Sequence, residues 1–209
     1  MCSKVSLQLL SITHLRVQTD TCASSQYRID HSRLTHHVHA ARPIAKGEEI
    51  TITCECFTCL HSPCPDIPDT NPFEPHSVRQ NALQNAFHFS CKCERCRSAS
   101  ASDATLSEIN DLQKTLGDWS AQSTATIEKA ESLLALMKEQ GFDGFLDTAY
   151  GYAALAYNAV GDAEEAKRYA ELAIEAIVLK DGQGTKDWAM WKEMVQDPKK
   201  HWSWKYRKP

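Results

Sequence analysis

The sequence predicts an α+β protein, with short strands and many cysteines in its first part and α-helices in its second part. Three observations predict this division. Alternating apolar and polar residues occur before residue 100, all nine cysteines lie before it, and apolar residues recur at helical spacing after it. A length of 209 residues is enough for one domain of ordinary size or two small ones.

The composition excludes several classes of protein. Apolar residues make up 42% and charged residues 24% of the chain, which is typical of a globular protein and not of a disordered one. A net charge of -4 gives no attraction for nucleic acid, so we expect none to be bound directly. No run approaches the roughly 18 apolar residues of a membrane span, so no membrane partner is expected.

The cysteines indicate a reducing compartment. Their number is odd, several follow a CxCxxC spacing, and we recognise no secretory signal in the first residues. These features favour metal thiolates over disulfides. We therefore expect an intracellular protein, in the nucleus and/or the cytoplasm.

The first part contains the predicted strands. Residues 26–31 and 34–42 form a predicted hairpin, because residues alternate in the second segment and the polar residues 30–33 suit a turn. Residues 43–47 form a second turn, and residues 49–53 a third strand rich in β-branched side chains.

A short helix is predicted over residues 77–87, after a stretch rich in proline and cysteine. Ser77 is its expected N-cap, and its expected apolar members are Val78, Leu83, Ala86 and Phe87. Residues 97–102 are small and polar, which is typical of a linker.

Five helices are predicted after residue 102. They cover residues 105–116, 124–140, 146–160, 163–179 and 188–195. Gly141, Gly161 and Gly182 follow three of these segments, as C-terminal caps do.

The two helices on either side of Gly161 carry small residues at the positions that would face each other. Ala153 and Ala156 precede the turn, and Ala166, Ala170 and Ala173 follow it. Such residues let two antiparallel helices approach closely, as in a tetratricopeptide unit. Generic helical packing explains the same pattern equally well.

Cys91, Cys93 and Cys96 place three thiols within six residues. Zinc takes four soft or borderline ligands in a tetrahedron, and one tight turn can supply three of them. The fourth ligand must then come from elsewhere in the chain. The alternative is a group of buried thiols without a metal. A second cluster, formed by Cys54, Cys56, Cys59 and Cys64, repeats the spacing and could hold a second zinc ion.

Two segments resemble a known family. Residues 38–52, VHAARPIAKGEEITI, resemble the late strand–turn–strand of a SET domain, and residues 87–96, FHFSCKCERC, resemble the post-SET segment that closes it. With the tetratricopeptide-like tail, this order is similar to the SET and MYND group of protein lysine methyltransferases. The resemblance divides the chain into an unassigned segment (1–20), a partial SET domain (21–86, with an insertion at 54–69), a post-SET segment (87–97) and a helical domain (103–209).

The resemblance implies transfer of a methyl group from S-adenosylmethionine to a lysine of a protein substrate. Phe89 would pack on the adenine of the cofactor, and Phe87 would line the lysine channel. Packing in the core explains both phenylalanines equally well. Cys22 would be the fourth zinc ligand beside the CxCxxC cysteines.

The sequence also departs from the family. The Asn and His that contact the cofactor are absent from the segment around Cys22, and Cys54 stands where the family has its catalytic Tyr, so no catalytic residue is assigned. The glycine-rich first strand and the MYND zinc ligands are absent as well. We therefore expect an incomplete SET-type protein with weak or no activity, and a truncated or mis-spliced product is one hypothesis for these departures. The alternative is a non-catalytic zinc-binding helical module that binds a partner protein.

The last residues combine tryptophan with lysine. Trp188, Trp191, Trp202 and Trp204 lie near four lysines. Such an end can mark a surface for a partner or nucleic acid. The alternative is packing of Trp188 and Trp191 at helical spacing, followed by a frayed, solvated end.

Overall fold

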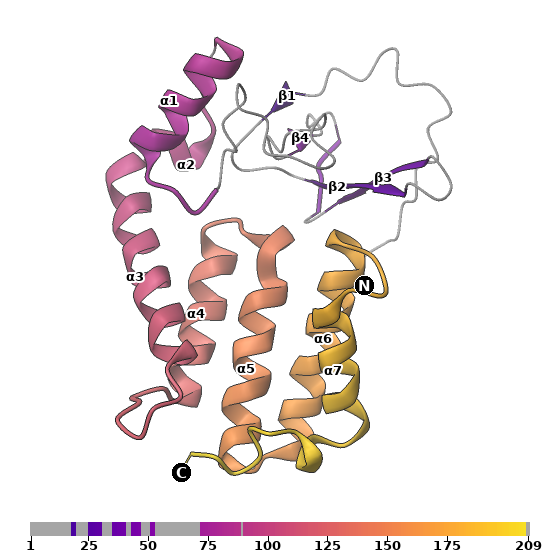
Figure 1. The fold of residues 1–209 in the computed structure, drawn as a ribbon. Coiled ribbons are helices and arrows are strands. Elements are labelled where there is room, and N and C mark those ends of the chain that lie inside the picture. Colours follow the sequence, from indigo (N-terminus) through magenta and orange to yellow (C-terminus); the bar gives the residue numbers. More distant parts are fainter. Residues whose placement is uncertain are drawn as a thin grey trace. The chain divides into compact units, whose positions relative to one another are not determined.

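The computed structural model describes residues 18–19, 25–30, 35–40, 43–46, 51–52, 72–88 and 90–207 (Figure 1). The chain divides into two compact units, Met1–Leu106 and Ser107–Pro209. The boundary falls within one helix, α3 (Ala99–Gly117). None of the helices in the described residues is long and apolar enough to cross a membrane.

The first unit contains a sheet of four short strands. They are β1 (Gln18–Thr19), β2 (Ser25–Asp30), β3 (Thr35–Ala40) and β4 (Thr51–Ile52), in the order β1-β4-β2-β3. Strands β2 and β3 are antiparallel, with Tyr27 opposite Val38, which confirms the predicted hairpin. Strand β4 runs parallel to β1 and β2 and lies within the predicted third strand, whose other residues are outside the described part of the chain. Four strands of this length do not define a SET-type fold, which stays a prediction.

Helix α1 (His76–Phe87) confirms the predicted helix but not its cap. The residue at the N-cap is Pro75, which makes no side-chain capping bond, so the assignment of Ser77 was wrong. The carboxylate of Asp103 instead accepts the backbone N–H of His76 at 2.8 Å. Of the predicted apolar members, Leu83 is fully buried, whereas Val78 is 49% exposed. Of these two residues, Leu83 therefore lies on the buried face of α1 and Val78 does not.

The segment predicted as a linker, residues 97–102, is helical. Helix α2 (Glu94–Arg97) ends at its first residue, and α3 begins two residues later. Alanine has the highest helix propensity, which favours helix over linker here. The hydroxyl of Ser102 is buried and accepts a hydrogen bond from Arg95, so a residue that looked solvated is part of the interior.

The second unit is helical, as predicted. Besides most of α3, it contains α4 (Ile127–Glu139), η1 (Asp143–Phe145), α5 (Leu146–Val160), α6 (Ala163–Lys180), α7 (Lys186–Gln196) and η2 (Pro198–Lys200). Each helix from α4 to α7 packs against the next one along the chain (Figure 1). The side chains of Thr126, Asp162 and Thr185 cap three of these helices by accepting a backbone N–H.

The predicted close packing of α5 and α6 is confirmed. Ala153, Ala166, Ala170 and Ala173 are fully buried. Gly161 joins the two helices with φ at 92°, a left-handed conformation that glycine adopts without a steric penalty. Small side chains therefore set the distance between these helices.

Residues 201–207 are not frayed, so that expectation was wrong for this part of the chain. The backbone N–H of Lys205 bonds to the carbonyl of Asn158 at 3.0 Å, and that of Arg207 to the carbonyl of Ala159 at 3.0 Å. The residues after η2 are thus fixed to the last turn of α5. Trp191 is buried, as its helical spacing predicted.

We predict that Gly151→Ala destabilises the second unit. A Cβ at this position in α5 would lie 2.6 Å from Cζ2 of Trp191, so one of the two helices must shift. Overpacking of this kind costs about 1–3 kcal/mol of the free energy of unfolding, which urea denaturation of the two proteins will measure. Gly117→Ala is the matched control, because its Cβ would meet only the Tyr152 hydroxyl, at 3.5 Å. Equal stability of both variants would contradict the prediction.

Candidate metal centre

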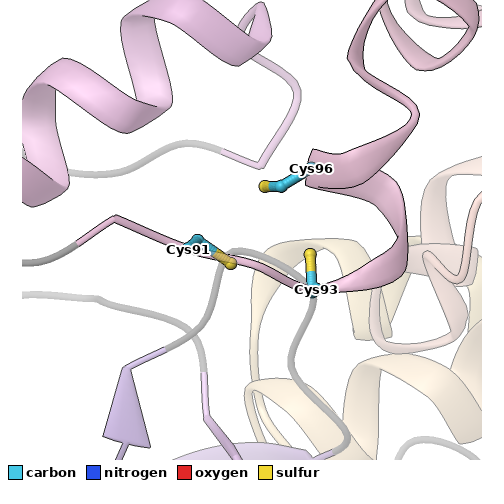
Figure 2. Close-up of side chains that lie close together, drawn as sticks. All are labelled: Cys91, Cys93 and Cys96. Atoms are coloured by element: carbon cyan, nitrogen blue, oxygen red, sulfur yellow. The ribbon is translucent and has the colours of Figure 1, made fainter.

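Three cysteines converge beside α2. The sulfur atoms of Cys91, Cys93 and Cys96 all lie within 4.8 Å of one another (Figure 2). Cys91 and Cys93 precede α2, and Cys96 lies within it. Zinc with bonds of about 2.3 Å to sulfur places its ligands roughly 3.8 Å apart, so the three thiols are close to the required separation. The donor set fits a metal ion that prefers thiolates.

Burial favours the same interpretation. Cys91 and Cys96 are each 8% exposed, Cys93 is half-buried, and Leu83 of α1 packs against them. This cluster is small, so apolar burial alone contributes little to holding the segment. A metal ion bound by the three sulfurs would contribute folding free energy here.

Gln80 fixes the backbone of the first cysteine. Its side-chain oxygen accepts the N–H of Cys91 at 3.0 Å, and its amide group donates to the Cys91 carbonyl at 2.9 Å. Because both backbone groups of one residue are bonded to one side chain, Cys91 cannot turn without breaking both bonds. Helix α1 thereby sets the position of the first sulfur.

Arg95 fixes the turn between the other two cysteines. Its guanidinium donates to the carbonyl of Pro72 at 2.8 Å and to the hydroxyl of Ser102 at 2.9 Å. The side chain is only 7% exposed. It therefore ties α2 to the residues before α1 and to the first turn of α3.

Arg79 brings a positive charge to the sulfurs. Its side chain is 1% exposed, and Nη1 donates to the Sγ of Cys96 over 4.0 Å. A buried guanidinium is stabilised by negative charge nearby, and three thiolates on a divalent metal ion would supply it, since they leave a net charge of −1. Arg79 therefore matches a metal–thiolate centre better than a group of neutral thiols.

Several predicted residues lie outside the described part of the chain. These are Phe89, Cys22 and the second cluster, Cys54, Cys56, Cys59 and Cys64, and the side chain of Phe87 also belongs to this group. Within the described residues, the cluster that could hold a metal ion consists of Cys91, Cys93 and Cys96 alone.

Reasoning from the sequence missed Arg79, Gln80 and Arg95. The spacing of Arg79 and Leu83, four residues apart in a predicted helix, was the one signal that the arginine lies on the buried face. Nothing in the sequence pattern indicated the amide clamp of Gln80.

Comparison with known proteins adds no assignment. No protein-family model matches the chain, and a search of curated proteins found no match.

We predict that Arg79→Met lowers the affinity of the centre for Zn²⁺. The variant removes a charged donor from a buried acceptor, which costs roughly 1.5–3 kcal/mol, or about 10- to 100-fold in affinity. Competition with a chromophoric chelator will measure this change. Arg97→Met is the matched control, because Arg97 lies in α2, next to Cys96 in the sequence, but its side chain is exposed. Equal affinities of the two variants would show that Arg79 does not balance the charge of the sulfurs.

Proposed function

We propose that the chain binds one structural zinc ion through Cys91, Cys93 and Cys96, with Cys22 as the fourth ligand. The convergence of three sulfurs is the observation that carries this proposal. The buried Arg79 supports a metal–thiolate centre, because thiolates on a divalent ion place negative charge beside its guanidinium.

The protein is then a SET-type protein related to the S-adenosylmethionine-dependent protein lysine methyltransferases of the SET and MYND group. The support is the order of its parts: a strand–turn–strand segment, then the cysteine turn, then a helical tail. In such a protein the zinc ion holds the segment that closes the methyl-transfer site. S-adenosylmethionine supplies an electrophilic methyl group, and Phe89 and Phe87 would position the adenine and the acceptor lysine.

This polypeptide has weak or no methyl-transfer activity in our proposal. Cys54 stands at the position of the family's tyrosine, and a thiol provides neither a phenolic hydroxyl nor a ring wall for the lysine channel. The second candidate function is a non-catalytic zinc-binding module that binds a partner protein through its helices. The compact second unit favours this candidate, because it needs no cofactor to present a surface.

We predict that Cys22→Ala releases zinc as readily as Cys93→Ala does. Both changes remove one of four ligands, and loss of one thiolate typically opens a structural site. Elemental analysis of the purified variants gives the zinc content per chain, and Cys2→Ala is the matched control outside both clusters. Retention of the metal in Cys22→Ala would show that another residue completes the site. Two zinc ions in the unaltered chain would establish a second site at Cys54, Cys56, Cys59 and Cys64.

We predict that S-adenosylmethionine does not bind tightly to the zinc-loaded chain. The cofactor contacts supplied by Asn and His in the family are absent from the segment around Cys22. Calorimetric titration, with transfer of a tritiated methyl group to a mixture of histones as a second readout, tests this. Tight, saturable binding with methyl transfer would overturn the expected inactivity. Complete absence of binding would favour the non-catalytic module.

A further inference from the structure

The second unit carries three aromatic rings in mutual contact near the end of the chain. Trp119 meets Trp202 at 4.5 Å and Tyr206 at 5.6 Å between ring centroids, in both cases edge to face. Trp202 and Tyr206 also meet edge to face, at 6.4 Å. Despite these contacts, Trp202 is 56% and Tyr206 58% exposed, more than any other large hydrophobic side chain that the structure describes.

The backbone beneath the two exposed rings is fixed. The side-chain amide of Asn158 donates to the hydroxyl of Ser203 at 2.8 Å, and both residues are fully buried. Lys205, which lies between Trp202 and Tyr206 in the sequence, has φ at 52°. This left-handed conformation is unfavourable for residues other than glycine. Its N–H bond to the Asn158 carbonyl holds it there. The fixed backbone at Ser203 and Lys205 therefore leaves the rings of Trp202 and Tyr206 exposed to solvent.

Arg207 fixes the third ring. Its guanidinium lies 3.8 Å from the centroid of Trp119 and donates to the carbonyls of Leu116 at 3.3 Å and Asp118 at 2.8 Å. The loop that carries Trp119 is thereby attached to the end of the chain. A rigid aromatic surface loses little conformational entropy when it binds, which is a property of recognition surfaces.

The same segment is strongly basic in an acidic protein. Residues 198–209 contain five lysines and arginines and no acidic residue, so the remainder of the chain has a net charge of −9. Lys199, Lys200 and Lys205 are exposed and lie near the two rings along the chain, and Lys200 pairs with Asp197 at 3.2 Å. Positive charge is therefore concentrated where the aromatic side chains are exposed.

We propose that this aromatic–basic surface, formed by Trp202, Tyr206, Lys199, Lys200 and Lys205, binds a short acidic segment of a partner protein that carries a leucine or an aromatic residue. The rings supply an apolar contact, and the lysines match the charge of the segment. Salt screens the charge of the lysines beyond about 10 Å. A short peptide segment can lie entirely within that distance of them. A nucleic acid strand would extend beyond that distance. Its phosphates would then be repelled by the rest of the protein, which has a net charge of −9.

The test uses the full zinc-loaded chain and a fluorescein-labelled peptide in which a central Leu-Phe pair is flanked by Glu on both sides. Fluorescence anisotropy should show saturable binding that weakens as ionic strength rises. Trp202→Ala should weaken binding by about tenfold or more, as loss of an aromatic anchor does. The charge reversals Lys199→Glu and Lys200→Glu should weaken it and reduce its salt dependence. Leu179→Ala, at an exposed hydrophobic residue on α6 outside this surface, is the matched control and should bind as the unaltered chain does.

Four results would overturn the proposal. They are absence of saturable binding at low salt, equal binding of a peptide with Lys in place of Glu, unchanged binding by a correctly folded Trp202→Ala protein, and tighter binding of labelled oligo-dT than of the acidic peptide. The last result would assign the surface to single-stranded nucleic acid. Circular dichroism establishes that each variant is folded, and Tyr206→Ala provides a second variant if Trp202→Ala is unstable. Zinc content is measured in parallel and is expected to be the same in all of these variants.

Discussion

The buried guanidinium of Arg79 is the constraint on which the arrangement around the cysteines depends. A charged group at 1% exposure is stable only beside compensating charge, and its hydrogen bond to Cys96 places it at the sulfurs. The apolar cluster around Leu83 is too small to supply that stability. The charge on α1 and the three sulfurs beside α2 therefore lie together, and a metal ion bound as a thiolate centre would place compensating negative charge next to Arg79.

The second unit is stabilised by the packing of its helices against one another. Alanines let α5 and α6 approach closely, and a partly buried ion pair joins the two helices. Lys180 donates to Asp147 at 2.6 Å, and both side chains are largely buried. Hydrogen bonding and the attraction of Asp147 raise the pKa of Lys180 against the opposing effect of burial. The packing of α5 on α6 is thus set by small side chains and by one ion pair between the two helices.

This contrast explains what the sequence could predict. Helix spacing, capping residues and glycines are local signals, and they located α5 to the residue and α6 to within one residue. The clamp of Gln80 on Cys91 and the bond from Arg95 to Ser102 join residues that are distant in sequence. No local pattern reports such bonds, which is why Ser102 was assigned to a linker and Ser77 to a cap. The cysteine spacing identified the ligands but not the groups that position them.

The last residues show a second effect of bonds that no local pattern reports. Trp191 is 6% exposed, as its helical spacing predicted, whereas Trp202 is 56% exposed on a backbone that is fixed. The difference arises from Asn158, whose buried amide bonds to Ser203 and turns the chain so that the neighbouring ring faces solvent. Replacing this polar anchor with an apolar residue would remove this donor and leave the buried Ser203 hydroxyl bonded to Nδ1 of His201, at 2.8 Å. The exposure of Trp202 is therefore set by buried hydrogen bonds of the helical unit, and this dependence distinguishes residues 201–207 from a chain end that is merely solvated.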